Sequence, residues 1–370
     1  MRTSEVVVVG GGVIGASVAF FLAREGIEVT LLERDALAAG ASGAAAGMLT
    51  PTNDAADAGP FFHWAQRSLE GFESLAAELL ERSGVDCEFV RSGTLRLAFD
   101  DDDVTRLQAR ADTFADARLE WFDAAAVRVV EPYAAEHAVG GSYAPDEAHV
   151  RSPLLARAYA AAARRFGARI ETGVEATGLR VDSGRVTGVE TRDGAWSTPH
   201  VVLCSGAWSA TGGVWPEGLA RLPVAPLRGQ ILSVEAPTPA PATTLLGAGG
   251  YVVPKRDGSL VVGATEEEVG FDARVTGEGL RQLLEMGARI VPAIGDCTFR
   301  SAWAGLRPTP SDGLPIIGPV DEVEGFAVAT GHHRNGVLLS PATGELITGW
   351  VSGKATPSEA RAFLPSRFTS

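Results

Sequence analysis

Three apolar segments near the N-terminus predict a strand, a helix and a second strand. Residues 6–9 are consecutive valines, a pattern typical of a parallel strand that is buried on both faces. Helix-like residues follow from Ile14 to Glu25, and Gly26 can then adopt the left-handed conformation that commonly ends a helix. The second strand is closed by Glu33. The order of these segments is that of a βαβ unit.

Helix-like and strand-like patterns alternate along the rest of the chain. We expect helices at 61–83, 101–115, 153–166 and 277–290, extended segments at 85–99, and strands at 169–172, 176–182, 185–191, 200–206, 230–236, 250–254 and 259–265. From Pro223 to about Arg300 the strands predominate and indicate a second sheet. The pattern predicts an α/β fold in which a second, sheet-rich α+β domain is inserted into a Rossmann-like domain.

A glycine-rich turn connects the first strand to the helix. Gly10, Gly12 and Gly15 form the pattern G-x-G-x-x-G, in which the glycines permit a tight bend, close approach of a pyrophosphate, and close packing of helix on strand. Glu33 follows at the distance typical of an acid that binds a ribose hydroxyl. The alternative is a glycine-rich turn without a ligand, but the position between strand and helix favours a dinucleotide site at the helix N-terminus.

Residues 6–23 have a second interpretation, as a signal peptide or a short membrane span. The glycines would weaken such a helix, and a second strand follows Gly26 at once, which a cleaved leader does not require. We therefore prefer the βαβ interpretation.

Composition and charge narrow the choice of partner. The chain carries a formal net charge of −14 and no dense run of Lys or Arg, which argues against nucleic acid and against an anionic membrane surface. Cys87, Cys204 and Cys297 are widely spaced and odd in number, so neither a metal site nor a disulfide framework is expected. We expect a small ligand, no metal, no membrane association and a reducing, cytoplasmic location.

Two further segments suggest contact with a bulky, partly anionic ligand. Residues 34–49 are mostly Ala and Gly, which lets the backbone run close to a flat ligand, although a flexible linker would have the same composition. Residues 331–351 place two histidines and Arg334 before an apolar run that reads as a helix beginning near Asn335. A helix start is positive, so these groups favour an anionic partner, whereas the alternative is an ordinary C-terminal helix packed on the sheet.

Five segments resemble the FAD-dependent amino-acid oxidases of the D-amino-acid oxidase superfamily: residues 34–49, 201–209, 249–265, 303–318 and 331–344. Within it, the chain is most similar to the glycine oxidase branch, which supplies the glycine imine for the thiazole ring of thiamine. The resemblance covers nearly the whole chain. It implies FAD as cofactor, a small amino acid or amine and O2 as substrates, hydrogen peroxide as product and no nucleic-acid partner; we also expect a homo-oligomer.

The resemblance also implies which residues hold the cofactor. The expected FAD-binding residues are Gly10, Gly12, Gly15, Glu33, Arg34, Ser42, Gly43, Ala46, Gly47, Met48, Val174, Ser205, Gly206, Asn335, Gly336 and Val337. The backbone of the last three would lie beside the flavin, where negative charge develops on reduction. Covalently flavinylated relatives carry a Cys in the segment that matches residues 305–310, and this chain has none there, so non-covalent FAD is expected. The FAD-binding domain would comprise 1–88, 148–221 and 305–370, and the substrate domain 89–147 and 222–304.

Arg307 is the candidate for binding the substrate. A guanidinium matches a carboxylate with two parallel hydrogen bonds, although an internal salt bridge would also explain an Arg in this apolar stretch. By resemblance, Arg307 and the hydroxyl of Tyr251 bind the carboxylate, and Arg334 lies near the substrate amine. Hydride transfer from a positioned neutral amine needs no general base, so none is assigned, and no role is assigned to His332 or His333.

The chain departs from the glycine oxidase pattern around this site. Gly249, Gly250 and Glu266 stand where relatives can carry bulkier or apolar residues, which leaves the width of the pocket open. A wider pocket would admit sarcosine or small D-amino acids, because one methylene changes selectivity only modestly.

Three functions are compatible with the sequence. The preferred one is an oxidase of glycine and similar small amines, the second a dehydrogenase that passes electrons to a quinone or a partner flavoprotein, and the third a flavin-binding protein without turnover. A fold alone does not choose among them. Arg307 and Tyr251 argue against the third, and the sequence shows no amphipathic membrane anchor that would favour the second.

Overall fold

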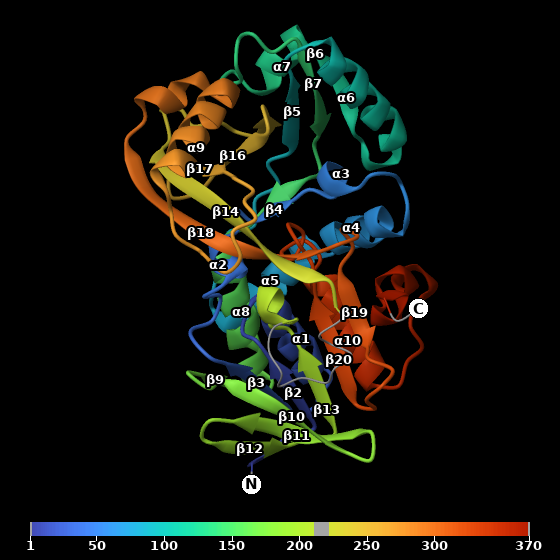
Figure 1. The fold of residues 1–370 in the computed structure, drawn as a ribbon. Helices are drawn as coiled ribbons and strands as arrows, with labels where there is room; N and C mark the ends of the chain where they lie inside the picture. Colours follow the sequence, from blue (N-terminus) through green and yellow to red (C-terminus); the bar gives the residue numbers. More distant parts are fainter. Residues whose placement is uncertain (1, 211–221, 369–370) are drawn as a thin grey trace.

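The structure is a computed structural model that describes residues 2–210 and 222–368; the expected domain boundary at residue 221 lies outside them. Figure 1 shows two parts, one above the other, with the N-terminus at the bottom of the lower part. The lower part contains a six-stranded sheet and the upper part an eight-stranded sheet. Both parts are built from separate segments of the chain, as the α/β prediction with interleaved domains required.

The six-stranded sheet has the order β19–β20–β13–β2–β3–β9. Its strands are Ile316–Pro319, Phe326–Thr330, His200–Leu203, Val6–Val9, Val29–Glu33 and Arg169–Thr172. All neighbouring strands are parallel except β19 and β20. The valines of β2 lie at the centre and are almost fully buried, which confirms the strand predicted from their uninterrupted apolar run.

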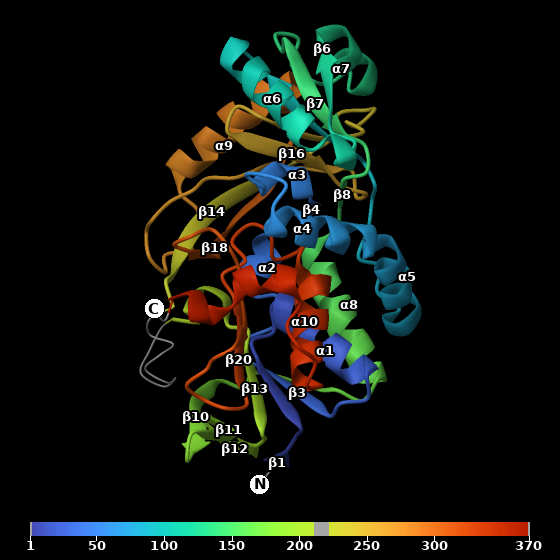
Figure 2. The same cartoon turned by 90° about the vertical axis from the view of Figure 1, so that its right-hand side faces the viewer.

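Helices cover one face of this sheet and a smaller sheet covers the other. Helices α1 (Val13–Arg24), α8 (Ser152–Arg165) and α10 (Ser340–Val351) lie side by side on one face (Figure 2). The other face packs against a four-stranded sheet of β1 (Arg2–Thr3), β12 (Gly194–Ser197), β11 (Arg185–Thr191) and β10 (Ala176–Asp182). No helix within the described part of the chain is both long and apolar enough to cross a bilayer.

The eight-stranded sheet has the order β18–β14–β17–β16–β15–β5–β7–β6. Its strands are Phe299–Pro310, Val224–Glu235, Ser259–Gly263, Gly250–Pro254, Thr244–Gly247, Thr94–Ala98, Gly140–Ala144 and Glu120–Asp123. Helices α9 (Gly277–Ile290), α6 (Asp101–Thr113) and α7 (Ala124–Val130) pack on it. The antiparallel strands β14 and β18 are 12 residues long each and reach down to the lower part (Figure 1).

Short elements connect the two parts. They are α2 (Ala41–Ala44), α3 (Pro51–Asp54), the paired strands β4 (Met48–Leu49) and β8 (Ala148–His149), and helices α4 (Pro60–Glu70) and α5 (Phe72–Ser83). The single helix predicted at 61–83 is therefore wrong. Gly71 separates two helices there, because glycine weakens a helix interior and permits the chain to change direction.

The helix expected to begin near Asn335 begins later. Residues 335–339 form turns, and α10 starts at Ser340. Pro341 explains the difference, because proline lacks an N–H and is accommodated in the first turn of a helix rather than in its interior. The positive end of this helix is consequently not at Asn335.

The crossing of α1 and α10 generates a stability prediction. A Cβ atom added at Gly344 of α10 would overlap the ring of Phe21 on α1, so Gly344→Ala should lower the free energy of unfolding by about 1–3 kcal/mol through overpacking. Gly349→Ala is the matched control on the same helix, because its nearest neighbour would be the Lys354 side chain at 3.8 Å. There alanine should stabilise by about 0.5–1 kcal/mol. Thermal or urea unfolding measures both, and equal effects would contradict the packing described.

Candidate active site

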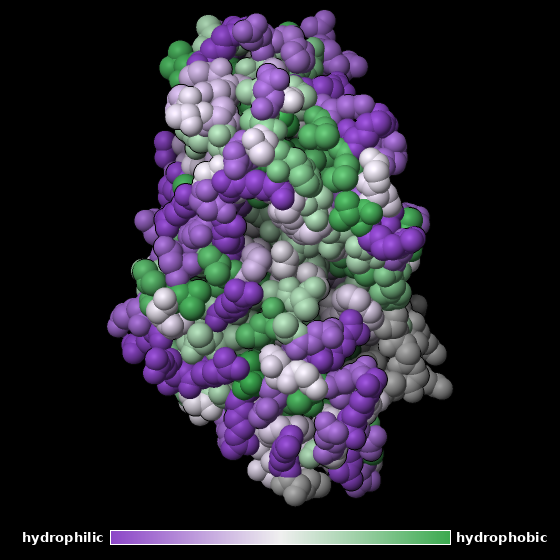
Figure 3. All heavy atoms as spheres, turned by 90° about the vertical axis from the view of Figure 1, so that its left-hand side faces the viewer, coloured by the Kyte–Doolittle hydropathy of each residue, from purple (hydrophilic) through white to green (hydrophobic). Residues whose placement is uncertain are grey.

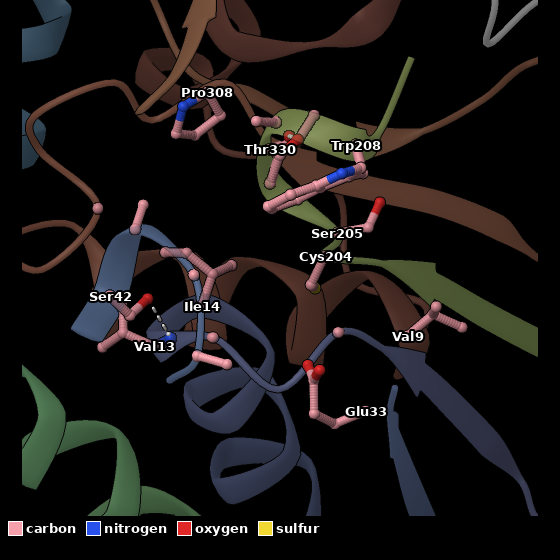
Figure 4. Close-up of a pocket in the computed structure, with 18 of the residues that line it drawn as sticks. Val9, Val13, Ile14, Glu33, Ser42, Cys204, Ser205, Trp208, Pro308 and Thr330 are labelled. Carbon is pink, nitrogen blue, oxygen red and sulfur yellow. Dashed lines mark hydrogen bonds between the residues drawn. The ribbon is translucent and has the colours of Figure 1, made fainter. Parts of the chain in front are cut away.

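A cavity of about 340 Å³ lies at the carboxyl ends of the strands of the six-stranded sheet, where open α/β sheets bind their ligands. Its walls come from the turn after β2, the end of β3, and the segments after β13 and β20 (Figure 4). The expected cofactor residues that line it are Gly10, Gly12, Glu33, Arg34, Ser42, Val174, Ser205, Gly206, Gly336 and Val337. The fold thus brings together residues from both ends of the chain.

The turn after β2 is shaped by its glycines. Gly10 has φ 112°, and a Cβ at this position would lie 2.5 Å from the carbonyl oxygen of Cys204. A Cβ at Gly15 would overlap the carbonyl oxygen of Gly10, so this glycine lets α1 start directly against the turn. The hydroxyl of Ser42 accepts a hydrogen bond from the backbone N–H of Val13 at 2.9 Å, which ties the Ala/Gly-rich segment to the helix start (Figure 4). The result is an open N-terminus of α1 facing the cavity.

Glu33 lies at the end of β3 and its carboxylate is held in place from both sides. Its Oε1 accepts a hydrogen bond from the N–H of Asp35 at 2.8 Å, and its Oε2 accepts one from the N–H of Gly11. Each carboxylate oxygen retains a lone pair for a further donor. The residue can therefore accept hydrogen bonds from a ligand's hydroxyl groups without moving.

Trp208 lines the same cavity and was not singled out from the sequence. In Figure 4 its indole lies across the cavity from Val13 and Ser42. The guanidinium of Arg34 sits 4.3 Å from the centre of the Trp208 ring, and the ring of Phe271 from the upper part lies 5.6 Å away. An aromatic residue directly after the buried strand β13 was the signal that could have identified it.

The Ala/Gly-rich segment is fixed rather than flexible. The buried Lys255 donates hydrogen bonds to the carbonyl oxygens of Ala46 at 2.6 Å and Val150 at 3.0 Å, and burial lowers its pKa to about 7. The indole N–H of Trp303 donates to the carbonyl of Ala44 at 3.1 Å. A Cβ at Gly47 would overlap the carbonyl of Val150. These contacts exclude the flexible-linker interpretation of residues 34–49.

A second, smaller cavity of about 80 Å³ adjoins the first. Both are lined by Ala41, Ala45, His333, Arg334 and Val337. Figure 3 shows that the molecular face on the side of β14 and β18 is hollowed near its middle, with mostly pale or green residues around the hollow. Expected site residues that line the smaller cavity are Tyr251, Arg307, Arg334, Ala46, Gly47 and Met48. Gly15, Gly43 and Asn335 line neither cavity.

Sheet register places the polar groups of the smaller cavity on one face. Tyr251, Gly263, Ile231 and Trp303 stand opposite one another across β16, β17, β14 and β18. Side chains along a strand alternate between its two faces. Trp303 and Arg307 are four positions apart on β18, so both side chains lie on the same face. The face that carries these residues closes the cavity toward the Ala/Gly-rich segment.

Arg307 has no carboxylate partner among the residues that the structure describes. Its Nη1 donates to the carbonyl oxygen of Thr265 at 3.1 Å. A Cβ at Gly229, on the neighbouring strand, would overlap the guanidinium, so only glycine leaves Arg307 this position. Burial raises the pKa of the Tyr251 phenol to about 12, and the hydroxyl remains a donor at neutral pH.

Arg334, in contrast, is already paired. Its guanidinium nitrogens lie 3.3 Å from Oδ1 of Asp54 and 3.4 Å from Oε1 of Glu266. These partners come from α3 and from the loop after β17, and neither was predicted as a partner. Of the positions that left the width of the pocket open, Gly250 does not bear on it: a Cβ there would face Met286 of α9, because adjacent strand residues point to opposite faces.

The two histidines beside Arg334 are uncharged at neutral pH. His332 Nε2 lies 3.0 Å from the hydroxyl oxygen of Thr343, and burial lowers the pKa of His332 to about 3. Burial also lowers the pKa of His333 to about 4, assisted by the positive charges of Arg334 and Arg307. Nε2 of His333 is buried without a hydrogen-bond partner in the described residues. Other atoms of His333 line both cavities.

These features fit FAD, the cofactor that the resemblance implies. The glycines at the start of α1 keep side chains away from the backbone that a pyrophosphate would approach. The fixed carboxylate of Glu33 can accept hydrogen bonds from ribose hydroxyls. The adjoining small cavity is lined by Ala46, Gly47 and Met48, and His333 lines both cavities. The resulting arrangement is a long cofactor site that adjoins a small, largely apolar pocket containing two arginines.

Comparison with known proteins agrees with this arrangement. The family model of FAD dependent oxidoreductases (DAO) matches residues 5–350. The chain is 38% identical to a glycine oxidase of Geobacillus kaustophilus, over 98% of this chain and 97% of that protein. The crystal structure of glycine oxidase from Geobacillus kaustophilus superposes with a TM-score of 0.94 and 35% identity, covering 99% of each chain.

A second kind of relative is larger. The bifunctional protein ThiO/ThiG of Trichormus variabilis is 34% identical over 99% of this chain, which spans 55% of that protein. The similarity therefore extends to a protein in which a region equivalent to this whole chain is joined to a further region.

The glycine cradle generates the second prediction. Gly15→Ala would bring a Cβ into the carbonyl of Gly10, so the turn must open and FAD binding should weaken by about 1–3 kcal/mol, as for overpacking elsewhere. The flavin-to-protein absorbance ratio after purification, and titration of the stripped protein with FAD, measure the effect. Gly349→Ala, far from the cavity, serves as control. An unchanged FAD affinity in Gly15→Ala would show that the turn does not contact the cofactor.

Proposed function

The chain belongs to the DAO family of FAD-dependent oxidoreductases, and from this premise we propose that it oxidises glycine and other small amines, such as sarcosine and small D-amino acids, to the imine and then the 2-oxo acid, with O2 reduced to H2O2. FAD is the cofactor of the family. The similarity to glycine oxidases over nearly the full length supports glycine as substrate.

One observation carries the choice of substrate class. The small cavity holds two arginines, and only Arg334 has carboxylate partners among the described residues, whereas Arg307 has none. A guanidinium in a largely apolar cavity is stabilised by an anion that forms two hydrogen bonds with it. A substrate carboxylate supplies that anion, and the hydroxyl of Tyr251 lines the same cavity as a further donor.

The residues of the chain act mainly by positioning the substrate. With its carboxylate on Arg307 and Tyr251, a small amino acid would present its α-carbon toward the larger cavity, where FAD when bound accepts the hydride and passes the electrons to O2. His333, which lines both cavities, has a lowered pKa and is neutral, so it adds no positive charge beside the amine. The volume of about 80 Å³ favours substrates with small side chains.

We assign the cofactor contacts from the cavity lining. Gly10 and Gly12 would face the pyrophosphate at the start of α1, Glu33 the ribose, and the segment around Ala46 the flavin ring. The backbone of Gly336 and Val337 would lie near the flavin edge that becomes negative on reduction. Asn335 would then act indirectly, because its backbone accepts from Leu339 and donates to His332, both at 2.8 Å.

A role in the synthesis of the thiamine thiazole follows from the same proposal. The ThiO/ThiG relative joins a region equivalent to this chain to a further region, which supports a link between amine oxidation and a second step. The imine of glycine is the product that such a step would consume. The chain would then catalyse the amine oxidation in that sequence of reactions.

Substitutions at the carboxylate site test the function directly. Arg307→Leu should lower kcat/KM for glycine by about 3–5 kcal/mol in transition-state stabilisation, because a charge-assisted pair is lost from a largely enclosed cavity. Tyr251→Phe removes one neutral donor and should cost about 0.5–3 kcal/mol. Peroxide production across glycine, sarcosine and small D-amino acids measures both, with bound FAD quantified in each variant.

The outcomes separate the alternatives. Near-normal turnover by Arg307→Leu would show that Arg307 is structural and that another group binds the carboxylate. If the wild-type flavin is reduced by glycine but is reoxidised slowly by O2 and rapidly by a quinone, the protein is a dehydrogenase. Peroxide formed in proportion to imine supports the oxidase.

The attachment of FAD provides a further prediction. No Cys lies in residues 305–310, and burial raises the pKa of Cys204, which lines the cofactor cavity, well above its ordinary value, so its thiol is a poor nucleophile. Acid or heat denaturation should therefore release all FAD into the supernatant. Flavin absorbance that remains with the precipitated chain would contradict non-covalent binding.

A further inference from the structure

The two arginines of the small cavity differ in their electrostatic state. Arg334 is shared by two carboxylates, Asp54 at 3.3 Å and Glu266 at 3.4 Å, and these three residues come from segments far apart in the chain. Arg307 is bound only to the carbonyl of Thr265 in the described residues. The cavity therefore contains one cation available to an anion and one that is already neutralised.

The position of Glu266 is determined by its neighbours. The carbonyl of Thr265 accepts from Arg307 at 3.1 Å, and the hydroxyl of Thr265 donates to Glu267 at 2.6 Å. Glu267 also accepts from Gln230 at 2.7 Å and forms an ion pair with the buried Arg228. With both neighbours held against β14 and β18, Glu266 is left on the side of Arg334, although its side chain is 48% exposed.

Asp54 approaches Arg334 from the opposite segment and is more enclosed, with 12% of its side chain exposed. Thr52, two residues before Asp54, donates hydrogen bonds to the buried Glu147 from its N–H at 2.9 Å and from its hydroxyl at 2.7 Å, which fixes the position of α3. Arg110 adds a hydrogen bond to the carbonyl of Ala55 at 3.0 Å. Hydrogen bonds on both sides of Asp54 therefore hold its backbone in place.

Neither carboxylate lines the small cavity, but both lie near residues that do. Asp54 and Glu266 are close enough to His333 to oppose the lowering of its pKa by the two arginines. Glu266 likewise acts on Tyr251, in the wall of the small cavity. A ligand with one carboxylate can bind Arg307, but a second anionic group would meet two negative charges around an arginine that is already paired.

We propose, building on the proposed function, that Asp54 and Glu266 restrict this enzyme to amines with a single carboxylate by keeping Arg334 neutralised. Loss of either carboxylate would leave Arg334 with one ion pair and free the guanidinium nitrogen on the other side, so that a second ligand carboxylate, as in N-carboxymethyl amino acids, could bind there with less repulsion. Specificity here arises from repulsion of the unwanted ligand as well as from attraction of the preferred one.

Two unreactive ligands test the proposal without turnover. Methoxyacetate and oxydiacetate have the same chain length as sarcosine and iminodiacetate, with an ether oxygen in place of the amine, and carry one and two carboxylates. Their dissociation constants for the holoenzyme are measured by titration of the flavin absorbance. In Glu266→Gln, the preference for methoxyacetate over oxydiacetate should fall by about fivefold or more, the scale of one partly screened charge contact.

Glu268→Gln is the matched control, because it removes the same charge from an exposed residue two positions away. It should leave the preference unchanged, whereas Asp54→Asn should shift it in the same direction as Glu266→Gln. In Glu266→Gln/Arg334→Gln the shift should disappear, because no released guanidinium remains. The proposal is overturned if Glu266→Gln and Asp54→Asn both keep the wild-type preference, if Glu268→Gln shifts it equally, or if the double variant retains the shift.

Steady-state kinetics test the same proposal independently of ligand binding. The ratio of kcat/KM for iminodiacetate to that for glycine should rise in Glu266→Gln and not in Glu268→Gln. Because the ether ligands are not oxidised, their binding reports on Arg334 even if glycine proves to be a poor substrate. Failure of glycine oxidation in the wild type together with the expected binding shifts would overturn the proposed function alone.

Discussion

A positive charge in a small, largely apolar cavity is stable only when an anion balances it, and the small pocket of this protein is organised around that constraint. Arg334 meets it within the chain, through Asp54 and Glu266. Arg307 does not, since a single carbonyl of Thr265 is its hydrogen-bond acceptor in the described residues. In the proposed function a substrate carboxylate supplies the missing negative charge, and this one ion pair would explain both why an amino acid binds and how it is oriented.

The sheet makes this arrangement possible by omitting side chains. Gly229 leaves space for the guanidinium of Arg307, and Gly263 leaves space for the ring of Tyr251, because a Cβ at either position would overlap those groups. Opposite them, the Ala/Gly-rich segment is clamped by Lys255 and Trp303. The two sheets thus meet where the larger cavity, proposed for the cofactor, adjoins the smaller cavity, proposed for the substrate.

Local sequence patterns predicted much of the cofactor-binding turn, but contacts between distant segments could not be predicted from them. The valines of β2, the glycine turn and Glu33 carry their signals within one short segment, and the strand, turn and helix form as expected. Lys255 and the partners of Arg334 depend on contacts between distant segments, which no periodicity reveals. Gly71 separates α4 from α5 and Pro341 lies in the first turn of α10, so both helix boundaries had a local signal in the sequence that the predicted helices did not take into account. Tyr251 was found only through a family resemblance.

The central claim is that the carboxylate on Arg307 positions the amine for oxidation. Anaerobic mixing of the holoenzyme with glycine or with methylamine, which lacks the carboxylate, tests it most directly through the rate of flavin bleaching. The account predicts rapid bleaching by glycine and bleaching slower by about a hundredfold or more with methylamine at equal concentrations of the neutral amine, the scale expected when a charge-assisted contact is lost. Equal rates, or no bleaching by glycine, would contradict it.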